Sequence, residues 1–206
     1  MSSALVAHAL LGARRATARL VALAVLAAPA LVACGDDNPY QGTAQLDTQS
    51  GLAIIYPANA SRAELPIALD FSGRAARRPG LYSTGAPNFD VALDLDEQGR
   101  VRILLPQYVL VPLSGVPRVG VQLTNVPFDD ATLAPSRSYR YDSVTVATVG
   151  QTVYVQTPGT SCSSTVPLYA KFIVDSVVGT DRAMFVRMRT DPNCGFRSLA
   201  PGRPTE

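Results

Sequence analysis

Three cysteines, one lysine and one histidine are the side chains of this 206-residue chain with the widest chemical repertoire. The histidine, His8, lies in a segment that we interpret below as a removed leader. Without it, the chain cannot build a Ser-His-Asp or Cys-His nucleophile system or a His-ligated metal site. No serine stands in a G-x-S-x-G arrangement or three residues before the lysine, Lys171. We therefore expect a protein that is not an enzyme.

Two clusters of charged residues could bind ions. Asp94–Gly99 has the carboxylate spacing and the glycine that begin an EF-hand calcium loop, but Leu105 replaces the bidentate glutamate of that loop. The same residues carry a hairpin signal, so we expect a turn there. Arg74, Arg77 and Arg78 could clamp an anion, but serine, glycine and proline bracket them, which predicts a solvated loop. We expect neither a metal nor a cofactor.

The residues before Cys34 have the features of an export signal. Leu20–Ala33 is an uncharged run of 14 residues that contains Pro29. A membrane-spanning helix needs about 20 residues, so this run is too short to span and is typical of a signal peptide. Three arginines precede it, as such signals require: Arg14, Arg15 and Arg19.

The sequence Leu31-Val32-Ala33-Cys34 resembles the lipobox of bacterial lipoproteins. In that class a diacylglycerol is attached to the cysteine thiol and the leader is cleaved before the cysteine. The resemblance implies that residues 1–33 are a signal peptide, that Cys34 is lipidated and that the protein is anchored in a membrane of the bacterial cell envelope. Gly35 stands where an aspartate is associated with inner-membrane retention in some bacteria, which favours the outer membrane. The alternative is a plain signal peptide followed by a cysteine.

Cys162 and Cys194 remain in a compartment where disulfides persist. Between them the sequence predicts a hairpin of Leu168–Val177 and Ala183–Thr190, whose open end brings the two cysteines toward each other. We expect one intramolecular disulfide, with two buried free thiols as the alternative.

The same hairpin predicts two cross-strand charge pairs. If the chain turns about Asp181, Asp175 lies opposite Arg187, and Lys171 lies opposite Asp191. Such pairs stabilise the register of a hairpin and do not indicate an active site.

Removal of the leader changes the charge balance. The chain has 18 Lys+Arg and 16 Asp+Glu residues, so without the three leader arginines 15 basic residues oppose 16 acidic ones, a net charge of −1. Nucleic-acid partners require clustered surplus positive charge, and we expect none. Residues 34–51 are interpreted as a polar, lipid-anchored tether, and residues 52–206 as one domain.

The domain is predicted to be all-β. Prolines interrupt any long amphipathic helix, and the intervals between them alternate apolar and polar residues. Phe89–Asp96 is the clearest strand, with an acidic face expected in solvent, and Val101–Leu105 is its hairpin partner. About nine or ten short strands indicate an antiparallel sandwich-like domain. The further candidates are Ala53–Tyr56, Pro66–Phe71, Tyr108–Leu113, Val119–Leu123, Tyr139–Val146 and Val153–Thr157.

Four segments, in their order along the chain, resemble the HmuY-like family of secreted bacterial lipoproteins. They are Phe89–Asp94, Val126–Pro135 with Tyr139 and Asp142 after it, Val153–Thr157 and Tyr169–Val174. The resemblance implies an all-β sandwich-like fold, and haem carriage by analogy with the best-known members. Their iron is often held by two histidines, which this mature chain lacks, and the tryptophan usual in the first segment is Phe89 here.

Other residue types could replace those histidines. Methionine pairs do so in some relatives, but Met184 and Met188 lie four residues apart, about 13 Å along a strand, and cannot face one iron from opposite sides. We expect them to pack in the core. Tyrosine is the other precedented ligand, although each tyrosine in the matching span is expected to be a strand residue with a buried ring and a satisfied hydroxyl. These are Tyr108, Tyr139, Tyr141, Tyr154 and Tyr169.

Two functions remain. The first is a binding module for a small apolar ligand, held in a pocket between sheet and loops by residues that the sequence does not identify. The second is a structural or protein-interaction lipoprotein of the envelope, which uses a sheet edge or loop surface. An open apolar cavity would favour the first, and a filled core with an exposed apolar patch would favour the second.

Overall fold

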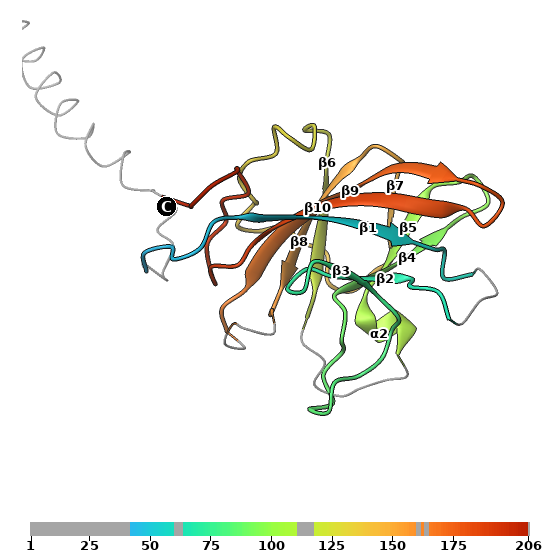
Figure 1. The fold of residues 1–206 in the computed structure, drawn as a ribbon, viewed down its shortest axis with the longest axis horizontal. Coiled ribbons are helices and arrows are strands. Elements are labelled where there is room, and N and C mark those ends of the chain that lie inside the picture. The colour runs from blue at the N-terminus through green and yellow to red at the C-terminus, as the bar shows by residue number, and fades with distance from the viewer. Residues whose placement is uncertain (1–41, 60–63, 111–117, 160–161, 163–164, 206) are drawn as a thin grey trace, which may run out of the picture. The chain divides into compact units, whose positions relative to one another are not determined.

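The computed structural model describes residues 42–59, 64–110, 118–159, 162 and 165–205 (Figure 1). Within these residues, ten strands form two antiparallel five-stranded sheets. The predicted all-β, sandwich-like class is confirmed. The leader and Cys34 lie outside the described residues.

One sheet, which we call sheet A, has the order β1-β10-β9-β8-β6, and the other, sheet B, has the order β3-β2-β4-β5-β7. The strands of sheet A are β1 (Gln49–Ile55), β6 (Gly120–Thr124), β8 (Thr152–Thr157), β9 (Leu168–Val178) and β10 (Ala183–Asp191). Those of sheet B are β2 (Ala68–Asp70), β3 (Ala75–Arg77), β4 (Val91–Leu95), β5 (Val101–Leu104) and β7 (Thr145–Ala147). A short helix, α2 (Pro106–Val109), follows β5. No helix in the described part of the chain is long and apolar enough to cross a membrane.

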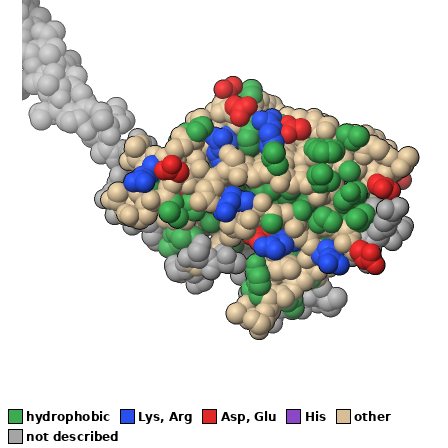
Figure 2. Space-filling view, viewed as in Figure 1, with side chains coloured by type: hydrophobic (Ala, Val, Ile, Leu, Met, Phe, Trp, Pro, Cys, Tyr) green, Lys and Arg blue, Asp and Glu red, His purple; other side chains and the backbone are tan. Residues whose placement is uncertain are grey.

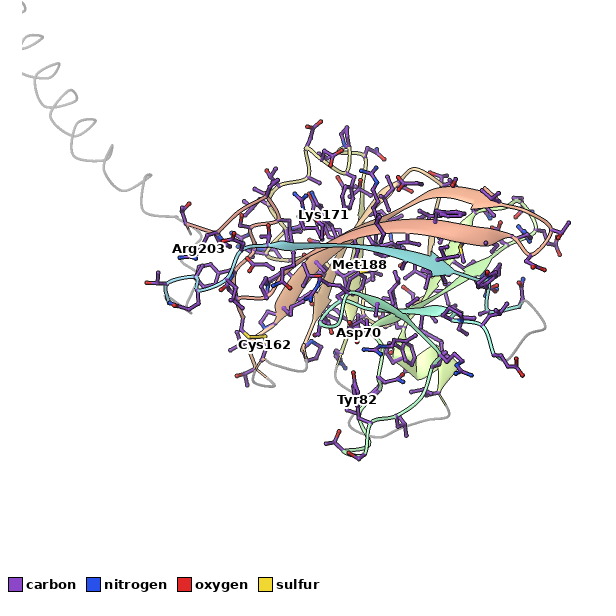
Figure 3. All side chains as sticks on the ribbon, viewed as in Figure 1. Asp70, Tyr82, Cys162, Lys171, Met188 and Arg203 are labelled. Atoms are coloured by element: carbon purple, nitrogen blue, oxygen red, sulfur yellow. A yellow bond between two sulfur atoms is a disulfide. The ribbon has the colours of Figure 1, made fainter. Side chains whose placement is uncertain are left out.

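The main core lies between the two sheets. Because side chains alternate along a strand, Val155 and Phe172 of sheet A point toward Leu93 and Ile103 of sheet B, and all four are fully buried. Burial of each such side chain stabilises the fold by roughly 1.5–3 kcal/mol. Met188, labelled in Figure 3, and Met184 belong to this core, which confirms the packing role predicted for the two methionines.

The outer face of β4 is covered, contrary to the expectation of a solvated acidic face. Ala92 is fully buried beneath Val109 and Leu110, which come from α2 and the residue after it. Asp94 is 5% exposed and accepts a hydrogen bond of 3.1 Å from Arg102. Within β4 the alternation predicted the two faces correctly, but Phe89, which precedes the strand, packs with Ala92 and not in the main core as expected. The alternation also carried no information about the helix that covers one face.

Two other strand predictions and one loop prediction need correction. The first residues of the predicted strand Tyr108–Leu113 lie instead in and just after α2, where Pro106 occupies the first helical turn and its missing N–H costs nothing. Residues 111–113 lie outside the described residues. Of Tyr139–Val146, only the end belongs to a strand, β7, although Arg140 forms an isolated bridge with Val121. Strand β3 lies where a solvated loop was predicted, at Arg77.

The β9–β10 hairpin forms, but in a different register. Arg187 donates two hydrogen bonds to Asp175, of 2.7 and 2.9 Å, although it lies opposite Ile173. The predicted pair between Lys171 and Asp191 does not form, because the position of the turn and a bulge after Phe185 place Lys171 opposite Arg189.

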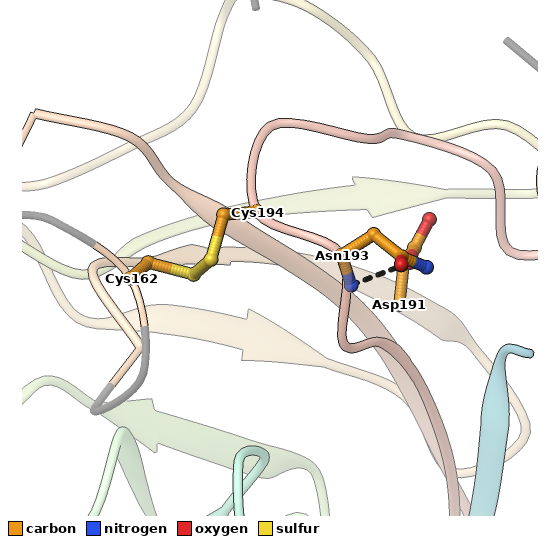
Figure 4. The surroundings of a disulfide bond; sticks show 4 residues. All are labelled: Cys162, Asp191, Asn193 and Cys194. Atoms are coloured by element: carbon orange, nitrogen blue, oxygen red, sulfur yellow. Dashed lines mark hydrogen bonds between the residues drawn. A yellow bond between two sulfur atoms is a disulfide. The ribbon is translucent and has the colours of Figure 1, made fainter. Parts of the chain in front are cut away.

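A disulfide joins Cys162 and Cys194, with an S–S distance of 2.04 Å and a Cα–Cα distance of 5.6 Å (Figure 4). Beside it, Asn193 accepts hydrogen bonds from the backbone N–H groups of Gln45 and Leu46, at 2.8 and 3.0 Å. Ala44 is 3% exposed. The folded domain therefore begins before residue 52, since a side chain almost 150 positions away satisfies the backbone of the polar segment.

We predict that removal of this disulfide by the double substitution Cys162→Ala and Cys194→Ala lowers the free energy of unfolding by about 3–4 kcal/mol, because a loop of about 33 residues is no longer closed in the unfolded chain. Urea denaturation of the two proteins measures the difference. Alkylation of the native protein before and after reduction is the control. Free labelling of both thiols without reductant would contradict the disulfide.

Candidate functional site

A small apolar hollow opens at the end of the sandwich where β4 begins and β8 ends. It has a volume of about 110 Å³, and we call it the end pocket. Its wall is formed by the last residue of β8 and the two residues after it, the loop before β4, the residue before β6 and the first residue of α2. Its lining residues are Ala86, Pro87, Phe89, Asp90, Pro106, Val119, Thr157, Pro158 and Gly159.

The wall of the end pocket is stiff. Pro87, Pro106 and Pro158 contribute rings with fixed backbone φ angles. Gly159 has φ +60°, and a Cβ atom there would lie 2.9 Å from the Cβ of Leu168, so a side chain at this position would strain the backbone and displace the strand. A wall of this kind is pre-formed and loses little conformational entropy when it binds a ligand.

Asp90 is the ionisable residue among the described residues that line the end pocket. It is 9% exposed, and one of its carboxyl oxygens, Oδ2, accepts a hydrogen bond of 2.7 Å from the backbone N–H of Phe71. The other, Oδ1, accepts from the hydroxyl of Thr157. Asp90, which directly precedes β4 of sheet B, is thereby bonded to the residue after β2 of sheet B and to the last residue of β8 of sheet A.

Burial raises the pKa of the Asp90 carboxyl to about 6, although the hydrogen bonds from Thr157 and Phe71 favour the ionised form. The neighbouring Asp70 raises it further. Asp70 is itself paired with Arg77, at 2.9 Å, and no cation of the described chain pairs with Asp90. The end pocket thus combines apolar walls with one carboxyl for which the described part of the chain supplies no counter-charge.

Sequence reasoning did not identify this site. Asp90 alternates with Asp94 and Asp96 in the same pattern, and no local signal distinguishes it from them. The covering of Asp90 depends on Phe71 and Thr157, which lie 19 and 67 positions away.

A second apolar surface lies on the outer face of sheet A. This groove, which we call the β1–β10 groove, has a volume of about 460 Å³ and includes the pair of Asp175 and Arg187. Leu52, Ile54 and Phe185 line it and are 80%, 46% and 42% exposed. Figure 2 shows hydrophobic side chains gathered on the visible face over the ends of β1 and β10.

Lys171 is fully buried on the same outer face (Figure 3). Its Nζ atom donates to the backbone carbonyl oxygens of Phe128 and Ala131 and lies 4.5 Å from the centroid of the Phe128 ring. Burial lowers the pKa of the Lys171 ammonium to about 8. Because its hydrogens are directed to carbonyls and no solvent reaches it, Lys171 holds the turn at 127–131 against sheet A and is not placed to attack a substrate.

Four of the five tyrosines in the matching span lie together in one cluster, in which the ring centroid of Tyr139 is 6.3 Å from that of Tyr169 and 6.5 Å from that of Tyr141. Tyr141 is partly buried outside the strands, and its hydroxyl donates to the side chain of Gln156. Tyr154 and Tyr169 are buried strand residues, as predicted, whereas Tyr139 is buried outside the strands and Tyr108 is exposed on α2. The expected satisfied hydroxyl is wrong for Tyr139, whose oxygen has no hydrogen-bond partner within the described residues. Burial raises the pKa of Tyr139 far above its usual range. No tyrosine lines the end pocket.

The two ion-binding patterns have structural roles. Asp96 accepts backbone hydrogen bonds from Gln98 and Arg100, and Gly99 has φ +74°, so this segment is the predicted turn. Arg77 pairs with Asp70 and does not lie in a solvated loop. Among the described residues, no group of three or more His, Cys, Asp or Glu side chains is placed to hold a metal ion.

Comparison with known proteins gives no matching family model, no similar curated protein and no similar solved structure. The HmuY-like resemblance therefore stays a prediction. The end pocket and the β1–β10 groove are the two surfaces from which a function can be argued.

We predict that this domain becomes more stable on mild acidification. Burial raises the pKa values of Asp90 and Asp191 from 3.8 to about 6, so between pH 4 and 6 the folded state binds more protons than the unfolded state. The free energy of unfolding then falls as the pH rises through this window, by roughly 1–3 kcal/mol for each carboxyl. Thermal unfolding at pH 4.5 and 7.5 measures the change.

Asp90→Asn is the informative variant, because it cannot ionise: its amide oxygen can accept from the N–H of Phe71 while its NH2 group donates to the hydroxyl oxygen of Thr157, which reverses that bond. We expect it to remove about half of the acid stabilisation. Asp47→Asn, which makes the same charge change at an exposed site, should leave the pH dependence unaltered. An equal pH dependence in Asp90→Asn and the parent protein would contradict the prediction.

Proposed function

We propose that this protein is a non-enzymatic, lipid-anchored binding module of the bacterial cell envelope, and that it holds a small apolar ligand in the end pocket. The observation that carries the proposal is the buried Asp90 carboxyl in the wall of an apolar hollow. Ligand sites are typically concave and apolar, with a few polar groups that orient the ligand. Asp90 and Thr157 are the groups that would do so here.

The volume of the end pocket limits the ligand. Pockets for drug-sized molecules measure about 300–1,000 Å³, and a dry cavity of about 150 Å³ holds benzene. At about 110 Å³, the end pocket fits a molecule of roughly six non-hydrogen atoms, or one group of a larger molecule. The HmuY-like resemblance supports a secreted binding domain, but this volume argues against haem as the ligand of the end pocket.

The polar groups of the end pocket are occupied in holding the fold together. The hydroxyl of Thr157 donates to one oxygen of Asp90, and the other oxygen accepts from the backbone N–H of Phe71, so these bonds connect β8 with the segment after β2. Among the described residues that line the hollow there is neither histidine nor cysteine. These contacts support a binding role for the site.

The lipid anchor would keep this domain close to a membrane. From Cys34 to Gln41 the chain has eight residues, which reach at most about 28 Å when fully extended. We propose the outer membrane as the location, because the residue that follows Cys34 is Gly35 and not the aspartate that is associated with inner-membrane retention. A binding module held there would meet ligands that enter or leave the envelope.

The alternative function is protein interaction in the envelope, and the β1–β10 groove favours it. Leu52, Ile54 and Phe185 form an exposed apolar surface, and the core between the sheets is filled. Apolar patches of this kind occur at interaction sites. The ligand experiment described below separates the two functions.

If Cys34 carries the lipid anchor, we expect the wild-type protein to incorporate a radioactive fatty acid in cells and the Cys34→Ser variant not to. The thiol of Cys34 is the attachment point, so its removal also retains the leader and increases the mass of the protein. Cys194→Ser is the matched control, because it removes a different cysteine and should keep the label. Equal incorporation of the radioactive fatty acid by Cys34→Ser and the wild type would contradict the prediction.

Calorimetric titration of the mature chain with neutral and charged compounds of about six heavy atoms tests the binding function. We expect saturable binding of at least one compound at one equivalent. Ala86→Trp, at a partly exposed lining position, should block the end pocket and abolish binding, whereas the exposed control Leu133→Ser should retain it. Haem should give a broad, free-haem-like spectrum. A sharp Soret band at one equivalent would make haem carriage the function, and no binding at all would favour protein interaction.

A further inference from the structure

We propose that the end pocket selects ligands with an alkylammonium group, whose positive charge pairs with Asp90 while its carbon atoms contact the proline and phenylalanine walls. This inference rests on the proposed function, since it takes the end pocket as the ligand site. Such an alkylammonium group could come from two sources, a free aliphatic amine or the side chain of a lysine in a partner protein.

The first argument is the missing counter-charge. Each oxygen of Asp90 accepts one hydrogen bond from the protein, from Phe71 or from Thr157. A carboxylate offers about four lone-pair sites, so both oxygens can accept further bonds. Buried carboxylates are normally paired with a cation, and no residue of the described chain supplies one here. A ligand cation would complete the pair.

The second argument is the shape and chemistry of the walls. An ammonium group is compact and donates three hydrogen bonds, so it can reach a carboxylate in a hollow of about 110 Å³ and leave room for four or five carbon atoms. The ring of Phe89 lines the same hollow as Asp90, and aromatic faces attract cations. The rings of Pro87, Pro106 and Pro158 provide apolar contact for the alkyl part.

The third argument is the charge of the surroundings. Two carboxylates, Asp90 and Asp70, lie near each other, and within the described residues only Asp70 has a cationic partner, Arg77 at 2.9 Å. The uncompensated charge at Asp90 therefore favours positive ligands over anionic ones. A neutral alcohol could donate one hydrogen bond to the carboxylate, but it would leave the charge uncompensated. Selection of a cation over a neutral ligand of the same shape is the property that distinguishes this site from a plain apolar hollow.

Pairing requires the ionised carboxylate, which sets the pH dependence. Burial raises the pKa of Asp90 to about 6, whereas alkylamines stay protonated up to about pH 10. Binding of the cation should therefore strengthen as the pH rises through 6 and level off above it. Binding of a neutral ligand should not strengthen in this window.

Titration of the mature chain with n-butylammonium, n-butanol and butyrate tests the proposal. At pH 7.5 we expect n-butylammonium to bind at least ten-fold more tightly than n-butanol, and butyrate to bind more weakly than both. At pH 5, and in Asp90→Asn at either pH, the affinities for n-butylammonium and n-butanol should become similar. Asp175→Asn, which removes a carboxylate from the β1–β10 groove, should retain the selectivity.

A second variant keeps the test valid if Asp90→Asn does not fold. Thr157→Val retains the carboxylate but removes the hydroxyl that stabilises its ionised form. We expect this variant to select the cation still, with the midpoint of its pH dependence shifted upward. A peptide with a central lysine separates the two sources: binding as tight as that of n-butylammonium assigns the site to a lysine side chain, and binding of n-butylammonium alone assigns it to a free amine.

Equal, saturable binding of n-butylammonium and n-butanol to the parent protein, blocked by Ala86→Trp, would overturn the selectivity and leave the proposed function intact. Tighter binding of butyrate would do the same. No saturable binding of any probe would overturn both.

Discussion

The hydrogen bonds of the buried Asp90 carboxyl are the contacts on which the end of the sandwich depends. Asp90 accepts one bond from Thr157, where β8 of sheet A ends, and one from the backbone of Phe71, just after β2 of sheet B. A single side chain thereby connects the two sheets beside the end pocket. A neutral group could make the same bonds at lower cost, because burial of a carboxyl without a counter-ion is unfavourable. That excess cost is the physical reason to consider the end pocket a functional site.

Other long-range polar side chains secure irregular segments in the same way. Lys171 binds two carbonyl oxygens of the turn at 127–131, and Asn193 binds the backbone of Gln45 and Leu46. Thr190 of β10 donates to the carbonyl oxygen of Phe71. Buried backbone groups need partners, and in a domain of short strands many of them lie outside the ladders. These side chains supply the partners that the strands cannot.

The two candidate surfaces differ in the contribution of polar groups. The β1–β10 groove is wide and exposed, and its charged residues, Asp175 and Arg187, are paired with each other. Its attraction for a partner would come from apolar area alone. The end pocket is smaller, but its carboxyl lacks a partner of opposite charge, so it can discriminate between ligands of equal shape. Specificity is therefore easier to derive from the end pocket.

The sequence alone determined the features that depend on neighbouring residues. Alternation and turn residues predicted the all-β class and the hairpin of β4 and β5, and export context with hairpin geometry predicted the pairing of Cys162 with Cys194. Only the tertiary structure decided which strand faces are covered. The burial of Asp90, the helix over Ala92 and the carbonyl partners of Lys171 all depend on residues distant in the chain. Alternation identifies which side chains share a face, but whether that face meets water or protein depends on how distant segments pack, which no local pattern encodes.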